Sequence, residues 1–191
     1  DSILLADFAK LPKQAKGLDL GAGCGTLGLL LCAKDAICSI TGIELSETAH
    51  AAALENIDRN NLQGRLFSIC ADLRSIHEHF PAGGFHCCVS NPPYFSGGYK
   101  SQTHAEARHT EHCSTEELFA AAAYALQYGG DFYLVHRPER LAEIFAKASA
   151  LHLEPKRLCL LRHKENSPVS LVLIQCRKGG KPGLKWEEWA L

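Results

Sequence analysis

Apolar segments rich in β-branched residues alternate with segments of helical periodicity along the chain. Continuous or alternating apolar runs are typical of strands, and apolar residues three and four positions apart are typical of helices. By these criteria, seven strands are predicted at residues 17–20, 37–43, 65–70, 85–90, 130–135, 156–161 and 170–176. Helices are predicted between them at residues 26–34, 46–60, 73–80, 114–128 and 138–150. This order predicts an α/β protein with a doubly wound, Rossmann-like sheet of seven strands.

Signals at the helix ends support this assignment. Ser114 precedes Glu117 by three residues, which is the spacing of a capping box, and the Gly129-Gly130 pair is expected to close the same helix. Ser46 suits an N-cap and Pro138 suits a first helical turn. Only a polar link joins the last two predicted strands, so we expect a mostly parallel sheet that ends in an antiparallel C-terminal hairpin.

Length and composition favour one untargeted domain. With 191 residues, the chain is expected to form a single domain over residues 1–191. It contains nine cysteines, an odd number, and most lie in apolar segments, which favours reduced thiols in a cytoplasmic protein. No apolar run is long enough for a membrane helix, so no membrane partner is expected. The chain lacks methionine and begins directly before a helical pattern at residues 3–9, so we expect a truncated N-terminal segment.

Charge is nearly balanced overall but uneven along the chain. The formal net charge is −1, which gives no general case for a polyanionic partner. Between residues 151 and 185, however, the basic residues outnumber the acids Glu154 and Glu165; they are Lys156, Arg157, Arg162, Lys164, Arg177, Lys178, Lys181 and Lys185. This segment fits either a solvated surface or a nucleic-acid footprint.

A glycine-rich turn follows the first predicted strand and opens a helix. Asp19, Gly21, Gly23 and Gly25 belong to this turn, where glycine allows a ligand to approach the backbone closely. The same segment matches the dinucleotide pattern G-x-G-x-x-G through Gly23, Gly25 and Gly28. The turn alone therefore fits a nicotinamide dinucleotide and S-adenosylmethionine equally well.

Two acidic residues at neighbouring strand ends could complete such a site. Glu44 ends the second predicted strand, about 20 residues after the turn, where a carboxylate can accept hydrogen bonds from ribose hydroxyls. Asp72 ends the third strand and could bind an adenine amine while Leu73 packs on the ring. Asp72 is equally suited to be a helix N-cap.

Asn91-Pro92-Pro93-Tyr94 follows the fourth predicted strand and separates these alternatives. An Asn side-chain oxygen and a proline carbonyl can accept both hydrogens of a planar amine or amide, and an aromatic ring can stack on it. Such a group has no role in hydride transfer, but it prepares a nitrogen to attack a methyl group. The motif therefore favours amino-group methylation over a Pro-rich structural turn.

Taken together, these motifs resemble the class I S-adenosylmethionine-dependent methyltransferases of the N6-adenine group. More narrowly, the chain resembles the bacterial family that methylates the adenine beside the anticodon of valine tRNA. The segments that carry the resemblance are residues 19–25, 42–44, 91–94, 107–111, 132–141 and 153–157.

The resemblance implies roles for individual residues. S-adenosylmethionine is the implied cofactor, tRNA is the implied partner, and the implied cofactor-binding residues are Asp19, Gly21, Gly23, Gly25, Glu44, Leu45, Asp72, Leu73 and Asn91. Asn91, Pro92, Pro93 and Tyr94 are the implied catalytic residues. Tyr94, Arg108 and His109 would contact the substrate, although a solvated polar loop also explains the last two.

Other functions remain open on the sequence alone. A protein glutamine methyltransferase acting on release factors would grip an amide nitrogen through the same motif. A nicotinamide oxidoreductase and a non-catalytic RNA-binding module are alternatives from other classes. No metal is expected, because His104, His109, His112 and Cys113 match no common tetrahedral spacing. We expect a monomer.

Overall fold

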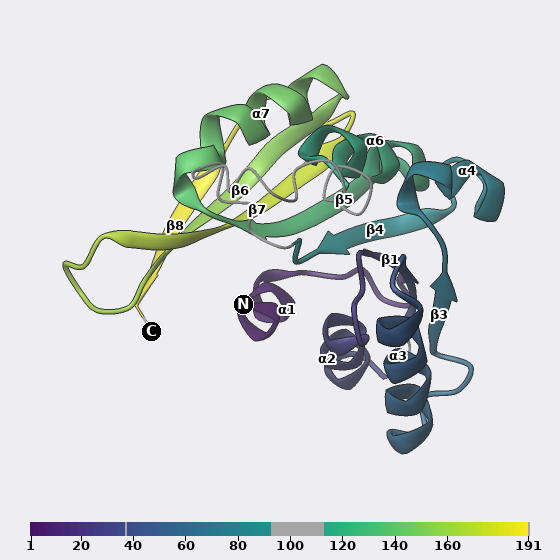
Figure 1. Ribbon diagram of the computed structural model, residues 1–191. Helices are drawn as coiled ribbons and strands as arrows, with labels where there is room; N and C mark the ends of the chain where they lie inside the picture. The colour runs from purple at the N-terminus through teal and green to yellow at the C-terminus, as the bar shows by residue number, and fades with distance from the viewer. Residues whose placement is uncertain (37, 93–112, 191) are drawn as a thin grey trace, which may run out of the picture.

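The computed structural model describes residues 1–36, 38–92 and 113–190, and its strands join one mixed sheet (Figure 1). The strands are β1 (Lys16–Leu20), β2 (Ser39–Glu44), β3 (Leu66–Cys70), β4 (Phe85–Ser90), β5 (Leu126–His136), β6 (Leu153–Arg162), β7 (Val169–Lys178) and β8 (Lys185–Ala190). The α-helices are α1 (Ser2–Phe8), α2 (Thr26–Lys34), α3 (Glu47–Arg59), α4 (Ile76–His79), α6 (Thr115–Ala125) and α7 (Leu141–Ala150), with short 3-10 helices η1 (Leu73–Ser75) and η2 (Pro138–Arg140).

The sheet has the order β3-β2-β1-β4-β5-β7-β6-β8. Strands β1 to β5 pair in parallel, whereas β7 is antiparallel to both β5 and β6. The predicted α/β fold with a mostly parallel sheet and an antiparallel C-terminal hairpin is confirmed. The predicted number of strands was wrong, because β8 follows the hairpin and pairs in parallel with β6.

Helices cover both faces of the sheet. Figure 1 shows α1, α2 and α3 on one side and α4, α6 and α7 on the other. Two apolar clusters correspond to these layers: one includes Leu5, Phe8 and Leu31, and the other includes Phe119 and Ile144. The central strands are apolar on both faces because helices bury both of their faces.

Most helix starts agree with the sequence, but one helix end does not. Ser46 accepts a hydrogen bond from the Ala49 N–H, Ser114 and Glu117 form a capping box, and Pro138 begins η2. The predicted role of Gly129-Gly130 as the end of a helix was wrong, because α6 ends at Ala125 and β5 already begins at Leu126. Leu126 is fully buried and pairs with Phe85, so burial overrides the glycine signal.

The three arginines of the basic C-terminal stretch form ion pairs within the protein. Arg157 forms an ion pair with Glu187, Arg162 with Glu188, and Arg177 with Asp131. Both glutamates belong to β8, just beyond the segment in which basic residues outnumber acids. Paired guanidinium groups are less available to phosphates, so these arginines give little support to a nucleic-acid footprint.

All nine cysteines are free thiols, and most of them are buried, whereas Cys24 and Cys70 are exposed. None of the helices in the described ranges combines the length and apolarity that crossing a bilayer requires.

Helix α1 is held against the C-terminal strands through Phe8. The Phe8 ring packs edge-on against Tyr133 and Trp189, with ring centroids 6.2 Å apart in each pair. The Arg157 guanidinium lies 4.1 Å from the centre of the Phe8 ring, and its Nη1 donates to the Phe8 carbonyl over 3.1 Å. Strands β5, β6 and β8 therefore help to hold α1 in place.

Replacing Arg157 by alanine should destabilise the protein. The substitution removes the stacking on Phe8 and leaves Glu187 without its ion-pair partner, so we expect a loss of about 1–3 kcal/mol in the free energy of unfolding. Urea unfolding measures this loss. Arg59→Ala is the matched control, because its exposed pair with Glu55 should contribute less than about 1 kcal/mol. Equal effects of the two substitutions would contradict the role of Arg157.

Candidate functional site

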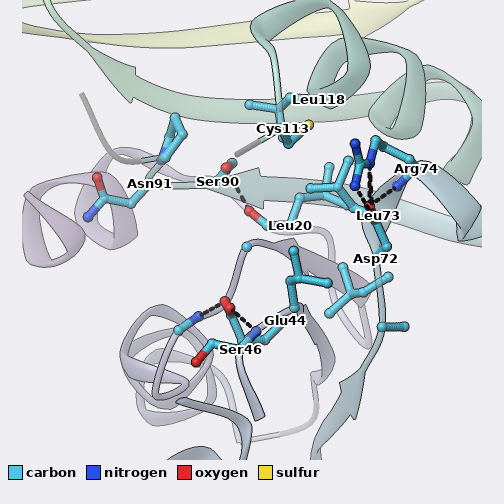
Figure 2. A pocket seen from close by; sticks show the side chains of 16 residues that line it. Leu20, Glu44, Ser46, Asp72, Leu73, Arg74, Ser90, Asn91, Cys113 and Leu118 are labelled. Carbon is cyan, nitrogen blue, oxygen red and sulfur yellow. Dashed lines mark hydrogen bonds and ion pairs between the residues drawn. The ribbon is translucent and has the colours of Figure 1, made fainter. Parts of the chain in front are cut away.

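A cavity of about 800 Å³ opens at the carboxyl ends of β1, β2, β3 and β4. This is the edge at which open α/β sheets bind ligands, and the volume is typical of a site for a small molecule. The lining residues are Leu20, Gly21, Gly23, Ile43, Glu44, Leu45, Ser46, Ala71, Asp72, Leu73, Arg74, Ser90, Asn91, Pro92, Cys113 and Leu118. Figure 2 shows that most of these residues lie at or just beyond the four strand ends, whereas Cys113 and Leu118 lie just before and within α6.

The glycine turn forms one wall of the cavity. Gly21, Gly23 and Gly25 have φ angles of 75°, 55° and 80°, in the left-handed region that favours glycine. A Cβ atom added at Gly21 or Gly23 would meet no atom within 4 Å, so this side of the turn is open to a ligand. Gly25 does not line the cavity; it is the N-cap residue of α2 and lies against Ala53.

Glu44 connects the glycine turn to the beginning of α3. One carboxylate oxygen accepts a hydrogen bond from the Gly23 N–H over 2.8 Å, and the other accepts from the Ser46 N–H, also over 2.8 Å (Figure 2). Each carboxylate oxygen can accept a further hydrogen bond. Glu44 is therefore oriented by the backbone and retains acceptor capacity on the cavity wall, beside Leu45.

Asp19 lies in β1 and does not line the cavity. Its side chain is 2% exposed, and its Oδ2 has no hydrogen-bond partner among the described residues. Burial, together with the nearby Glu44 charge, raises the pKa of Asp19 to about 7, and a hydrogen bond from the Gly28 backbone opposes the shift. A buried carboxyl of this kind is a common feature of ligand sites.

Asp72 adopts the capping role that the sequence left open. Its carboxylate accepts a hydrogen bond from the Arg74 N–H over 2.9 Å and caps η1. The Arg74 guanidinium also forms an ion pair with the same carboxylate, and these hydrogen bonds lower the pKa of Asp72. Leu73 lines the cavity beside this pair. Sequence analysis missed Arg74 because no motif marks a partner of this carboxylate.

Asn91 and Pro92 lie at the end of β4, on the cavity wall. The buried Ser90 hydroxyl donates to the Leu20 carbonyl over 2.7 Å, which ties the end of β4 to the end of β1. The Asn91 side-chain Nδ2 donates to the Ser2 hydroxyl of α1 over 3.0 Å. Figure 2 shows the Asn91 side chain directed toward α1 and away from Asp72.

Several residues singled out in the sequence cannot be placed in the site. Pro93, Tyr94, Arg108 and His109 lie outside the described residues. The cluster of His104, His109 and His112 does so as well, so the expectation of no metal there stays a prediction. Within residues 1–36, 38–92 and 113–190, no group of three or more His, Cys, Asp or Glu side chains is arranged to hold a metal ion.

The sequence as a whole is similar to known methyltransferases. The family model of the methyltransferase small domain matches residues 1–151. The tRNA1(Val) (adenine(37)-N6)-methyltransferase of Photobacterium profundum is 32% identical over 179 residues, which are 92% of this chain and 75% of that protein.

Two solved structures have a similar fold. A crystal structure described as a predicted O-methyltransferase, from Agrobacterium tumefaciens, covers 100% of this chain and 86% of its own, with a TM-score of 0.82 and 22% identity. Geranyl diphosphate C-methyltransferase from Streptomyces coelicolor, in complex with S-adenosyl-L-homocysteine, covers 93% of this chain and 79% of its own, with a TM-score of 0.70 and 13% identity. At these identities, the likeness is one of fold.

Asp19→Asn should change how stability depends on pH. The pKa of Asp19 is raised from 3.8 to about 7 on folding, so between these values the folded state binds more protons than the unfolded chain. The free energy of unfolding of the parent should therefore fall as pH rises through this window. The amide of the variant does not titrate, so the variant should not show this fall. Urea unfolding at a series of pH values should show the variant gaining stability over the parent, by roughly a few kcal/mol across the window. A difference that is constant with pH would contradict the assignment.

Proposed function

This chain belongs to the methyltransferase small domain family, and we propose that it transfers a methyl group from S-adenosylmethionine to the exocyclic N6 amine of an adenine in tRNA. The name of the Photobacterium profundum relative supports this substrate. The observation that carries the proposal is the placement of Asn91 and Pro92 at the end of β4, on the wall of the same cavity as Glu44 and the glycine turn.

The residues of the cavity fit S-adenosylmethionine. The open side of the turn at Gly21 and Gly23 leaves room for the methionine part of the cofactor, and we assign Asp19, in β1 just before this turn, to the same part. Glu44 has acceptor capacity for the ribose hydroxyls, with Leu45 beside it. We assign Asp72 and Leu73 to the adenine, with Gly25 fixing the turn at the start of α2.

The chemistry follows from the poor nucleophilicity of an adenine amine, whose lone pair is delocalised into the ring. In our proposal, the Asn91 side-chain oxygen and the Pro92 carbonyl each accept one amine hydrogen, which draws the nitrogen out of the ring plane and frees its lone pair. Pro93 fixes the turn, and Tyr94 stacks on the base. When bound, S-adenosylmethionine supplies a methyl group on a positively charged sulfur.

Orientation of the amine and the methyl group provides most of the rate acceleration in this scheme. The amine nitrogen becomes acidic once it carries the methyl group, so the proton can leave to water and no strong base is required. Holding the two reacting groups in line accounts for large accelerations in intramolecular reactions. An unpaired adenine in a tRNA loop also lowers the cost of leaving the base stack.

Partners and location follow from the same proposal. We assign Arg108 and His109 to RNA contact, since the arginines of the C-terminal strands are engaged by acids of the protein itself. One sheet contains strands from both halves of the chain, which supports treating residues 1–191 as a single methyltransferase domain. We further propose a cytoplasmic monomer, as expected for an enzyme that acts on tRNA.

Asn91→Ala should abolish methyl transfer while cofactor binding largely survives. The variant loses the side-chain acceptor for the amine but leaves the glycine turn and Glu44 intact, so we expect kcat to fall at least about a hundredfold. Calorimetric titration with S-adenosylmethionine and methyl transfer to unmodified tRNA provide the two measurements. Asn60→Ala, at the exposed end of α3, is the matched control and should keep the parent's rate. Full activity of Asn91→Ala would refute the mechanism.

A further inference from the structure

The hydroxyl of Ser2 contacts the residue on which the proposed reaction depends. The Asn91 Nδ2 donates to Ser2 Oγ over 3.0 Å, in a partly buried contact between the first turn of α1 and the end of β4. Resting on the proposed function, we propose that Ser2 is a positioning residue for methyl transfer, which holds the Asn91 amide in its reactive orientation. Figure 2 shows the Asn91 side chain directed toward α1, in agreement with this contact.

The proposal follows from the chemistry of a primary amide. The oxygen and nitrogen of an Asn side chain exchange places when the terminal torsion turns by half a rotation, and this torsion is broad and roughly two-fold. The amine of the substrate requires an acceptor, so only one of the two orientations is productive. A partner that accepts from Nδ2 favours the orientation in which Nδ2 faces that partner and Oδ1 faces away from it. Ser2 is such a partner in this structure.

Helix α1 is anchored firmly enough for this role. Leu5 and Phe8 are fully buried. The Lys34 Nζ donates to the Ala6 carbonyl over 2.6 Å, and the Tyr133 hydroxyl donates to the Lys10 carbonyl over 2.8 Å. These bonds connect α1 and the residues after it to α2 and β5. The Ser2 hydroxyl is therefore carried by a fixed element, and little further ordering is required when Asn91 binds to it.

Ser2 belongs to a helix far from β4 in the sequence. A hydroxyl provided by a separate helix can fix the amide without adding side chains to the tight Asn-Pro turn. Because α1 is itself held by Arg157 and Trp189, the orientation of Asn91 depends on the C-terminal strands. Strands β6 and β8, neither of which neighbours β4 in the sheet, thus take part in preparing the site.

Ser2→Ala, compared with Ser2→Thr, tests the inference in the full chain. Ser2→Ala removes the acceptor, so we expect kcat for methyl transfer to fall about tenfold, with the dissociation constant of S-adenosylmethionine within about twofold of the parent's. Ser2→Thr retains a hydroxyl and should restore kcat to within about threefold of the parent. Single-turnover methylation of unmodified tRNA and calorimetric titration are the measurements, with the thermal midpoint of each variant as a check on folding.

Ile3→Ala is the matched control on the same helix, because Ile3 is 64% exposed and its substitution leaves the Ser2 contact intact. It should keep the parent's kcat. An unchanged kcat in Ser2→Ala beside an active parent would overturn this inference and leave the proposed function standing. Equal losses in Ser2→Ala, Ser2→Thr and Ile3→Ala would also overturn it, since they would indicate a displaced helix. A parent that never methylates tRNA adenine would overturn the proposed function and, with it, this inference.

Discussion

The reversal of strand order at β1 is the constraint on which the site depends. From β1 the chain builds outward through β2 and β3 on one side, and then crosses to β4 and β5 on the other. The helices that follow β1 and β4 thus cover opposite faces of the sheet, and a crevice opens between their connections. The glycine turn, Glu44 and Asn91 all lie at this crevice. Buried hydrogen bonds then fix the strand ends relative to one another; the Ser90 hydroxyl, for example, donates to the Leu20 carbonyl.

The C-terminal strands contribute to the site from a distance. They add an antiparallel extension to a parallel sheet, and their arginines pair with Glu187, Glu188 and Asp131. Through Arg157 and Trp189 they fix Phe8, and through α1 they reach Ser2 and Asn91. The two halves of the chain are thereby coupled by packing, although no residue of β6, β7 or β8 lines the cavity.

Much of this arrangement could be predicted from the sequence, because it depends on local signals. The turn at Gly21 and Gly23 requires positive φ angles that favour glycine, and Glu44 follows at a spacing set by one strand-helix-strand unit. Capping residues such as Ser114 act within their own helix and are equally visible. Turns, strand ends and helix caps that depend on residues close together in the sequence can therefore be predicted from its pattern.

The remaining features depend on contacts between distant segments. Strand β8 combines charged residues with Trp186 and Trp189, and ion pairs from Glu187 and Glu188 help to hold it against β6. Gly129 lies within β5 rather than ending a helix, because Leu126 is buried against the sheet. Ser2 contacts Asn91, which lies 89 positions away in the sequence. No periodicity or motif could have indicated these contacts.

The most direct measurement is methyl transfer from labelled S-adenosylmethionine into unmodified tRNA, followed by digestion to nucleosides and mass spectrometry. Our account predicts label in N6-methyladenosine, from an adenine in the anticodon loop, and none when Asn91 is replaced by alanine. A tRNA pool that stays unlabelled would contradict the account. Label in a glutamine amide of a release factor, with none in RNA, would contradict it as well and would identify a protein amide as the substrate.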